Sequence, residues 1–385
     1  MDFGFSPEQD QFRMEMRRFA RTEFQEGYKD RAKADEFPWE ELGQLAQVGI
    51  LGLGIPEQYG GQGEIDPITF GIAAEEISYA DFNLGFMPLT TGLVGQLIVN
   101  HASDSVKEEW LPQMTAGTSL FSFALTEPHA GSDATKIKCR ADRTKGGWIL
   151  NGEKTSITLA AHGDACVVFC RTDGEPGSAK GVTALMVPLD QEGVSRTRFR
   201  DTGMIPIGRG SLFFDDVFVP EENLLGEEGM AFHMVMHEFD FTRAALGLMC
   251  VGAAKASVDE AVTYAKEREA FGKPIVQFEG VSFQLAEHFT FLEAARWLAY
   301  RTLWLREAGE PHTAEAAMCK WWIPKRAGEV IHDCLIIHGH GGYSDDFPLE
   351  QRMRDVLGLE LGDGTANIQK LIIAREKIGR VALPY

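Results

Sequence analysis

The spacing of hydrophobic residues changes twice along this chain, and that change limits its fold more than any other feature. Up to about residue 118, apolar residues such as Phe12, Met16 and Phe19 recur at helical spacing, behind a helix start at Ser6-Pro7-Glu8-Gln9. Between about residues 119 and 225, short apolar runs such as ACVVFC, GVTALMV and SLFFDDVFV indicate β-strands. From about residue 226 the helical spacing returns in longer segments. The order predicts an α+β protein with three domains, at 1–118, 119–225 and 226–385.

Length and composition are those of a globular protein of enzyme size. The chain has 385 residues, 44% of them hydrophobic, and a formal net charge of -20. The negative charge argues against non-specific binding of nucleic acid or of an anionic membrane surface. No stretch approaches the run of about 20 apolar residues that a membrane helix needs. The start MDFGFSPEQD lacks the basic and apolar blocks of a signal peptide. We therefore expect a cytoplasmic protein with no membrane insertion and no nucleic-acid partner.

The metal-binding residue types do not form a metal-site pattern. The six cysteines are scattered without metal-site spacing, and the chain is too large to need disulfides. His338 and His340 stand two residues apart, but no matching Cys, His or carboxylate motif accompanies them. Glycines flank this pair and indicate a close backbone approach instead. We expect no metal.

Four short segments have chemical potential, but each alone has an ordinary structural explanation. In FALTEPHAGSDA, residues 123–134, backbone N–H groups and hydroxyls could hold a polar cofactor, or the segment could be a plain turn. Asn151-Gly152 predicts a tight turn between two strands. REAFGKPI, residues 268–275, is typical of a helix stop. In LGDGT, residues 361–365, an aspartate between two glycines is most often a turn.

Taken in order, these segments resemble the acyl-CoA dehydrogenase family. The matching motifs are TEPxAGSD at 126–133, NGxKxxIT at 151–158, RxxFGxPI at 268–275, GxGGY at 339–343, RD at 354–355 and GT followed by IQ within 363–369. The resemblance covers essentially the whole chain. It implies an N-terminal helical domain, a middle β-barrel or sandwich and a C-terminal four-helix bundle. It also implies FAD as cofactor, oxidation of an acyl-CoA between its α and β carbons, an electron-transfer flavoprotein as acceptor, and a homotetramer.

The resemblance further implies roles for single residues. Asp363 falls where the family has its catalytic glutamate, which takes the α-proton while its backbone N–H and the flavin ribityl chain bind the thioester carbonyl. The implied FAD contacts are Phe123, Leu125, Thr126, Gly131, Ser132, Ser156, Ile157, Thr158, Arg268, Phe271, Ile336, Gly339, His340, Thr365 and Asn367. The implied substrate contacts are Ser132, Phe239, Asp240, Thr242, Arg243, Gly362 and Gly364, with Arg243 as the candidate for charge complementarity to CoA. Arg268 and Phe271 match positions that reach the FAD of a neighbouring subunit.

The position of the base is narrowed by two absences in the sequence. Some relatives carry the base beside the arginine that matches Arg243, but Thr242 stands there in this chain. The stretch between Asp81 and Asp104 contains no acidic residue, so the helix of the acyl pocket offers no second base. Asp363 is the one plausible base.

Three departures from the family pattern remove bulk near the reacting carbons. Asp363 is one methylene shorter than Glu, about 1.5 Å of reach. Gly362 precedes it where a large residue is common, and Ser156 replaces an aromatic residue against the flavin. We expect a cyclic or α-branched acyl-CoA, such as cyclohexanecarboxyl-CoA oxidised to its 1-ene in alicyclic acid degradation. The alternatives are a short- or medium-chain straight acyl-CoA, an oxidase-like or monooxygenase-like flavoprotein, and a non-catalytic acyl-CoA-binding homologue.

The adenosine side of FAD departs from the family as well. Glu279 and Ile336 stand where glutamine is common, and His340 replaces a glycine. How these residues handle adenosine stays open.

Overall fold

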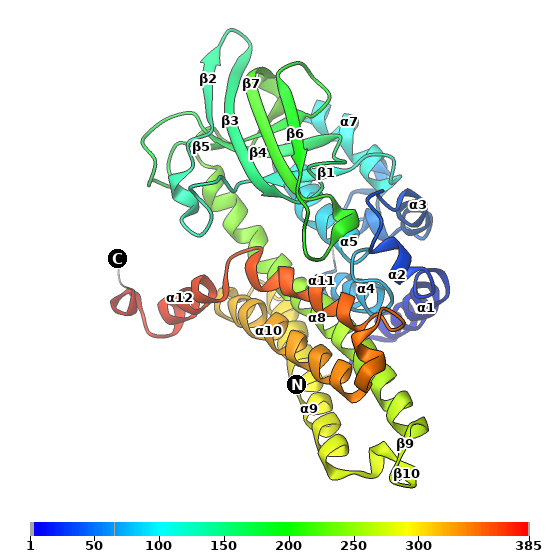
Figure 1. Cartoon of the computed structure of the whole chain (residues 1–385). Helices are drawn as coiled ribbons and strands as arrows, with labels where there is room; N and C mark the ends of the chain where they lie inside the picture. Colours follow the sequence, from blue (N-terminus) through cyan, green and yellow to red (C-terminus); the bar gives the residue numbers. More distant parts are fainter. Residues whose placement is uncertain (1–3, 65, 384–385) are drawn as a thin grey trace.

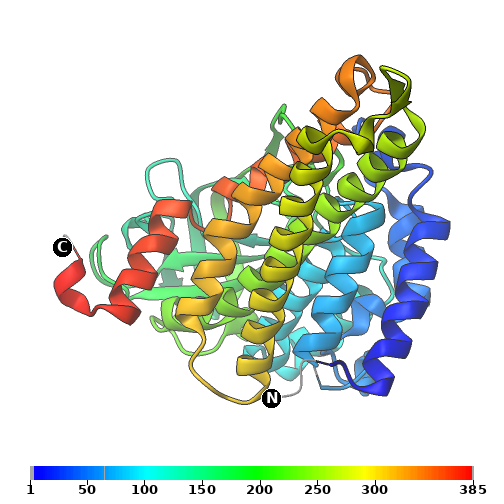
Figure 2. The same ribbon diagram turned by 90° about the horizontal axis from the view of Figure 1, so that it is seen from below.

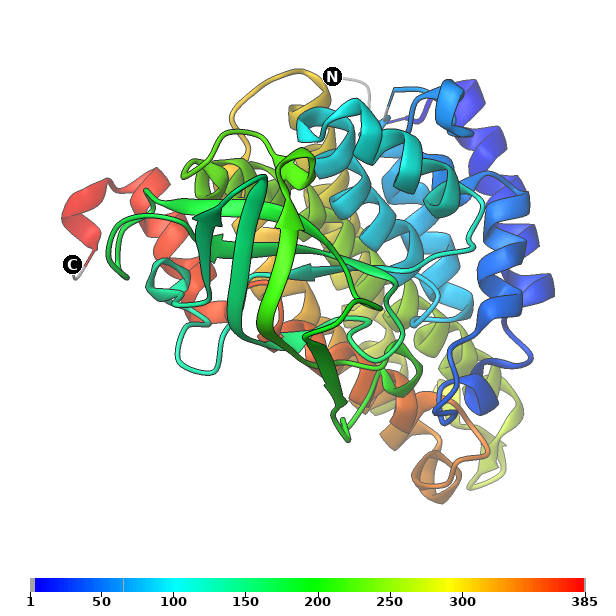
Figure 3. The same ribbon diagram turned by 90° about the horizontal axis from the view of Figure 1, so that it is seen from above.

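The structure, a computed structural model, describes residues 4–64 and 66–383. A twisted sheet formed by the middle of the chain lies over a layer of long helices, and the N-terminal helices pack along one side of that layer (Figure 1). The predicted α+β class and the order of helical, sheet and helical regions are confirmed. Viewed from above, the sheet lies over part of the C-terminal helices, the N-terminal helices lie beside it, and the last helix projects beyond it (Figure 3).

The N-terminal region is helical, as its residue spacing predicts. Its first helix, α1 (Pro7–Glu23), begins with a capping box in which the Gln9 N–H donates to Ser6 Oγ at 3.2 Å and the Ser6 N–H donates to Gln9 Oε1 at 3.0 Å. The other α-helices are α2 (Tyr28–Arg31), α3 (Trp39–Gln47), α4 (Pro67–Ala80), α5 (Phe86–Thr90), α6 (Gln96–His101) and α7 (Asp104–Thr115). Helix α4 is buried on almost every face, so it forms the centre of this region.

The middle region is one open sheet. Its strands are β1 (Phe121–Ala124), β2 (Arg140–Thr144), β3 (Gly147–Ile157), β4 (Ala165–Arg171), β5 (Val182–Pro188), β6 (Val194–Arg198), β7 (Gly210–Pro220) and β8 (Leu224–Leu225). They lie in the order β6-β7-β3-β2-β4-β5-β8, with β1 paired to β4. Within the described residues no strand pairing joins β6 to β8, so the expected barrel is wrong and both edges stay unpaired.

The turn expected at Asn151-Gly152 is also absent. Strand β3 runs straight through both residues, and the register with β7 shifts there, which is the mark of a β-bulge. Gly152 has φ 139°, and Asn151 exchanges two hydrogen bonds with Asp216 of β7, at 2.9 and 3.0 Å. The actual turn lies just before β3, where Gly146 has φ 82°. An Asn-Gly pair therefore serves a bulge here, because glycine can supply a positive φ to a bulge as well as to a turn.

The C-terminal region consists of long helices that lie side by side (Figure 2). They are α8 (Ala231–Glu267), α9 (Glu279–Glu307) and α10 (Thr313–Ile337), followed by α11 (Leu349–Leu361) and α12 (Ala366–Lys377). Helix α10 continues through Pro324. The predicted helix stop after α8 is correct, but residues beyond it also pair, as the short hairpin of β9 (Glu269–Ala270) and β10 (Lys273–Pro274).

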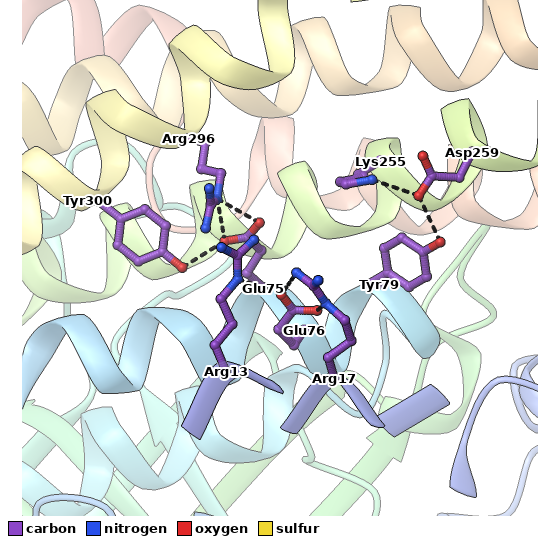
Figure 4. Close-up of polar contacts among 9 residues, drawn as sticks. All are labelled: Arg13, Arg17, Glu75, Glu76, Tyr79, Lys255, Asp259, Arg296 and Tyr300. Atoms are coloured by element: carbon purple, nitrogen blue, oxygen red, sulfur yellow. Dashed lines mark hydrogen bonds and ion pairs between the residues drawn. The ribbon is translucent and has the colours of Figure 1, made fainter. Parts of the chain in front are cut away.

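Buried ion pairs join α4 to the helices on both its sides (Figure 4). Glu76 accepts hydrogen bonds from Arg17 of α1 at 2.7 and 3.0 Å and from Arg13 at 3.0 Å. Glu75 accepts from two residues of α9, Arg296 at 2.9 Å and Tyr300 at 2.7 Å. The N-terminal and C-terminal helices are thus held on opposite sides of one helix.

Candidate active site

The predicted base lies in a short loop between two helices. Helix α11 ends at Leu361, and Asp363 and Gly364 have φ 57° and 92° before α12 begins at Ala366. Positive φ is unusual for a residue with a side chain and is found where the surroundings enforce it. In this conformation Asp363 Oδ2 accepts a hydrogen bond from Thr242 Oγ1 of α8 at 3.2 Å. The loop therefore directs the carboxylate at α8.

Two buried side chains donate hydrogen bonds to backbone carbonyls of this loop and of the end of α11. Gln369 is fully buried, and its Nε2 donates to the carbonyl oxygens of Asp363 at 3.1 Å and Gly364 at 3.3 Å. Lys320 of α10 is 1% exposed; its Nζ donates to the Leu359 carbonyl and lies 3.5 Å from the Gly364 carbonyl. A Cβ at position 364 would lie 2.5 Å from Gln369 Nε2 and would displace that amide, and φ 92° is strained for any residue with a side chain, so glycine is favoured here.

The charges around Asp363 oppose one another. Burial raises the pKa of the Asp363 carboxyl, while Arg243 and Lys320 and the hydrogen bond from Thr242 lower it, and the net shift is upward. A carboxylate with a raised pKa in a partly dry site can accept a proton from a weak carbon acid.

Arg243, the candidate for charge complementarity to CoA, lies among buried polar side chains. It is 5% exposed, and its Nη1 donates to Asp240 Oδ1 at 3.0 Å. Thr313 donates to the second oxygen of Asp240 at 2.6 Å, so that carboxylate is held on both sides. Arg243 is therefore buried and ion-paired, and its positive charge lowers the pKa of the Asp363 carboxyl.

Helix α11, which carries the loop, is anchored to the N-terminal and middle regions by one buried carboxylate. Asp355 accepts hydrogen bonds from Tyr28 Oη at 2.9 Å, the Met204 N–H at 2.6 Å and Asn83 Nδ2 at 3.3 Å. These partners come from the N-terminal helices and from the loop before β7. The sequence marked Asp355 only as part of a motif, because these three partners are all more than 100 residues away in the chain.

The TEPxAGSD segment is braced from inside the sheet. Lys154 is fully buried, and its Nζ donates to Glu127 Oε1 at 2.7 Å and to the Leu125 carbonyl at 2.9 Å. Glu127 also accepts the Cys139 N–H at 2.9 Å. The exposed face of this segment and of the end of β3 carries hydroxyls without a hydrogen bond to any residue in the described part of the chain: Thr126, Ser132 and Thr158. A rigid edge with free hydroxyls fits the polar rim of a flavin ring.

Other predicted FAD contacts at this edge are mixed in character. The side chains of Leu125 and Ile157 lie in the hydrophobic cores, so only their backbone atoms could face a ligand. Ser156 is exposed with φ 60°, and its Oγ accepts from Arg209 Nη1 at 3.1 Å. Arg209, paired with Asp201 at 2.9 Å, was not singled out from the sequence.

One aromatic contact joins the cofactor and substrate residues across two regions. The ring of Phe123, a predicted FAD contact on β1, lies 5.5 Å from the ring of Phe239, a predicted substrate contact on α8. The Arg243 guanidinium carbon lies 5.5 Å from the Phe239 ring centre. Phe123, Phe239, Thr242, Arg243 and Asp363 are therefore connected within one chain.

The remaining predicted FAD residues are elsewhere. Arg268, Phe271, Ile336, Gly339 and His340 lie around the β9–β10 hairpin and the end of α10, at the end of the long helices remote from the sheet (Figure 1). Phe271 is 97% exposed with φ 53°, and a cavity of about 330 Å³ is lined by apolar residues that include Phe271 and Ile336. We call these five residues the distal group. Thr365 and Asn367 flank the start of α12, beside the Asp363 loop.

Histidine, cysteine and membrane features of the described residues add no further site. The ring of His338 is buried, its Nδ1–H donates to the Cys334 carbonyl at 2.7 Å, and the ring stacks on Tyr264 at 4.5 Å. Residues 4–64 and 66–383 contain no group of three potential metal ligands. Among the same residues, no helix combines the length and apolar character of a membrane span.

Comparison with known proteins covers the chain from end to end. The N-terminal, middle and C-terminal domain models of acyl-CoA dehydrogenase match residues 6–118, 122–217 and 229–378. The chain is 35% identical to acryloyl-CoA reductase (NADH) of Anaerotignum propionicum, over 99% of this chain and 97% of that protein. It is 36% identical to 3-(aryl)acrylate reductase of Clostridium sporogenes, over 96% and 98%.

A solved structure agrees with these relatives. Butyryl-CoA dehydrogenase from Megasphaera elsdenii superposes with a TM-score of 0.93 at 31% identity, over 98% of this chain and all of that one. FAD is the cofactor of this family, and the hydroxyl-lined edge described above suits it. With its three domain models matched in order and relatives of 35% and 36% identity covered almost completely, the chain belongs to the acyl-CoA dehydrogenase family, as an FAD-dependent oxidoreductase acting on CH–CH groups.

Proposed function

We propose that this protein oxidises the α,β bond of an acyl-CoA with Asp363 as the base. The observation that carries the proposal is the Asp363 loop: a carboxyl of raised pKa, held at positive φ against Thr242 by two buried side chains. FAD, when bound, supplies the acceptor for the β-hydride. The other steps fall to the chain's own residues.

The proton is removed by the Asp363 carboxylate. Thr242 holds one carboxylate oxygen, and the described residues offer the other oxygen no hydrogen bond, so it can accept the α-proton. The backbone N–H of Asp363 has no acceptor in the described part of the chain either. It can donate to the thioester carbonyl and stabilise the negative charge that develops there.

We propose a substrate that is bulky at its α-carbon, with cyclohexanecarboxyl-CoA, converted to the 1-ene, as the favoured case. A Cβ at Gly362 would meet only the Gly358 carbonyl, at 3.5 Å, so a side chain would fit and its absence leaves space. Asp363 adds to that space by being shorter than Glu.

An anaerobic screen tests both claims. Bleaching of the bound flavin would be followed with linear, branched and cyclic acyl-CoAs, and we expect the highest kcat/KM for the ring substrate. Gly362→Phe should lower kcat/KM for the ring substrate at least about tenfold while butyryl-CoA is affected less, because the new ring fills the proposed space. A preference of the unaltered protein for butyryl-CoA would refute the substrate proposal and leave the reaction intact.

The reverse reaction is a second candidate. Two relatives are named as reductases, of acryloyl-CoA and of a 3-(aryl)acrylate. In this direction a protonated Asp363 would deliver a proton to the α-carbon of an enoyl thioester, and the upward shift of its pKa makes that form more accessible than for an ordinary aspartate. Reoxidation of the reduced flavin by enoyl-CoAs, compared with reoxidation by an electron-transfer flavoprotein, measures which direction is faster.

We also propose a homotetramer in which the distal group completes the FAD site of a second subunit. The support is that one chain leaves Phe271 almost fully exposed, far from its own hydroxyl-lined edge (Figure 1). Asp363→Asn and Arg268→Glu subunits would be inactive alone. Coexpressed, they should regain activity, because one site of a mixed pair carries neither change. Absence of complementation in mixed oligomers would contradict the shared site.

A further inference from the structure

Lys320 is a buried cation with no carboxylate partner. It is 1% exposed in the middle of α10, and in the described residues its ammonium hydrogen-bonds only carbonyl oxygens, those of Leu359 and Gly364. Burying an unpaired charge is unfavourable unless it is well hydrogen-bonded. The position of the two carbonyl groups suggests why a lysine is buried here.

The two carbonyls lie on either side of Asp363. In a continuing α-helix, the N–H of residue 363 would donate to the carbonyl of residue 359. Helix α11 instead ends with the Gly362 N–H bonded to the Gly358 carbonyl at 3.0 Å, and Asp363 turns away at φ 57°. The Asp363 N–H therefore makes no hydrogen bond to the Leu359 carbonyl, and the ammonium of Lys320 donates to that carbonyl in its place.

We propose that Lys320 is a positioning residue for the proposed reaction: by taking the Leu359 carbonyl it keeps the Asp363 N–H free for the thioester oxygen. The inference rests on the proposed role of Asp363. Without the ammonium, the Leu359 carbonyl would be buried with no donor, and the nearest donor able to satisfy it is the Asp363 N–H itself. Helix α11 would then gain one hydrogen bond, from the Asp363 N–H to the Leu359 carbonyl. That N–H would no longer be free for the thioester oxygen.

The charge of Lys320 has a second consequence. Charged groups face Asp363 from two packed helices, Arg243 and Asp240 of α8 and Lys320 of α10, and Glu360 of α11 acts on Lys320. Burial lowers the pKa of Lys320 and the charge of Asp363 opposes that shift. Removing the ammonium should therefore raise the pKa of Asp363 further, because one of the cations that favour the carboxylate is gone.

The test uses the FAD-loaded protein with Lys320→Met, Lys320→Gln and a matched control, Lys325→Met, an exposed lysine on the same helix. Flavin reduction by substrate would be followed by anaerobic stopped flow across the pH range. A second readout is the charge-transfer band of a 3-thia acyl-CoA, whose α-proton can leave but whose β-sulfur has no hydride to give. That band measures stabilisation of the deprotonated thioester without turnover.

We expect Lys320→Met to slow flavin reduction on the order of 100-fold, the usual loss for one oxyanion donor, and to weaken the charge-transfer band. In the plot of its flavin-reduction rate against pH, the acid limb should move to higher pH by roughly one unit. Lys320→Gln keeps a donor without charge, so it should show the same pH shift with a smaller rate loss. Lys325→Met should match the unaltered protein.

Other outcomes overturn the inference. A merely structural lysine would free the loop, expose Asp363 to water and move the acid limb down, toward the pKa of an ordinary aspartate. Unchanged pH profiles, or loss of FAD from both Lys320 variants, would also exclude a positioning role. If Asp363→Asn still bleaches the flavin, the proposed function itself is wrong, which is a separate result.

Discussion

Two buried charged clusters in this protein share their residue types and differ in how completely they are hydrogen-bonded. The staple cluster consists of Arg13, Arg17, Glu75, Glu76, Arg296 and Tyr300 (Figure 4). Each of its four carboxylate oxygens accepts at least one hydrogen bond. The loop cluster consists of Thr242, Arg243, Asp240, Lys320 and Asp363. Within the described residues, Asp363 has one bonded carboxylate oxygen and an N–H without an acceptor. Each cluster also holds one guanidinium nitrogen without a partner among those residues, Arg243 Nε here and Arg296 Nη2 in the staple cluster, so the difference lies in the carboxylates.

The difference shows what each cluster can do. A cluster whose carboxylate oxygens are all bonded offers no free acceptor to a ligand, so its interactions hold α1, α4 and α9 together. A partly bonded cluster is less favourable for folding but keeps an acceptor and a donor ready for a substrate. The same contrast predicts that changes in the loop cluster alter chemistry and changes in the staple cluster alter stability.

The largest effect is expected from Asp363→Asn. Loss of the base should slow flavin reduction by about 10⁴-fold, while FAD content and the melting temperature are unchanged or higher, because an unfavourably buried carboxylate is removed. Stopped-flow reduction and thermal unfolding measure the two effects. Asp190→Asn, at an exposed site, is the control. A large fall in melting temperature would break the comparison.

Glu75→Gln should show the opposite pattern. The amide cannot compensate the buried Arg296, so we expect unfolding free energy to fall by about 3 kcal/mol with little change in the rate of flavin reduction. Denaturant unfolding followed by flavin and tryptophan fluorescence measures it, with Glu287→Gln on the exposed face of α9 as control. A rate loss that exceeds the stability loss would mean that the staple cluster takes part in the chemistry.

Thr242→Val sharpens the comparison within the loop cluster. Among the described residues, the Thr242 hydroxyl donates the one hydrogen bond to the Asp363 carboxylate, and this bond lowers the pKa of Asp363. The substitution removes that bond. We expect a further rise of the acid limb in the pH profile and a rate loss of roughly tenfold, the value of one hydrogen bond to a charged group. The control, Thr290→Val on α9, should leave the pH profile unchanged. If the acid limb does not shift in Thr242→Val, the hydrogen bond from Thr242 to Asp363 has no role in setting the pKa.

The smallest effect concerns the pH dependence of stability, which has opposite signs in the two clusters. Burial alone would raise the pKa of Glu76, but Arg17 and Arg13 outweigh it and the pKa is lowered. Its contribution to stability is thus present above the unfolded value and lost as pH falls. The pKa of Asp363 is raised, so its contribution is present at low pH and lost as pH rises.

Unfolding curves between about pH 4 and pH 8 test this sign difference. On acidification, the stability advantage of the unaltered protein over Glu76→Gln should shrink. The unaltered protein should also become less unstable relative to Asp363→Asn. Both differences in unfolding free energy should shrink by about 1.4 kcal/mol per unit of pKa shift. Parallel curves for both pairs at every pH would contradict the assignment.

Much of the architecture was readable from local pattern. The capping box at Ser6, the strand β4 and the long helices follow from side-chain spacing and end signals that act over a few residues. The bulge at Asn151-Gly152 and the open sheet were not predicted correctly. The reason is that a positive φ suits a turn and a bulge equally, and strand order depends on pairing between distant segments.

The sequence by itself determined the family, the three-part order and the presence of Asp363 in a glycine-flanked loop, because ordered motifs and periodicity are properties of the chain alone. Only the tertiary structure decided that Lys320, Gln369 and Thr242 are the residues that hold this loop, that Arg243 is buried, and that the distal group is far from Asp363 within one chain. Those relations join residues on different helices, and the helix packing that creates them is specified by burial over the whole fold, which no short pattern records.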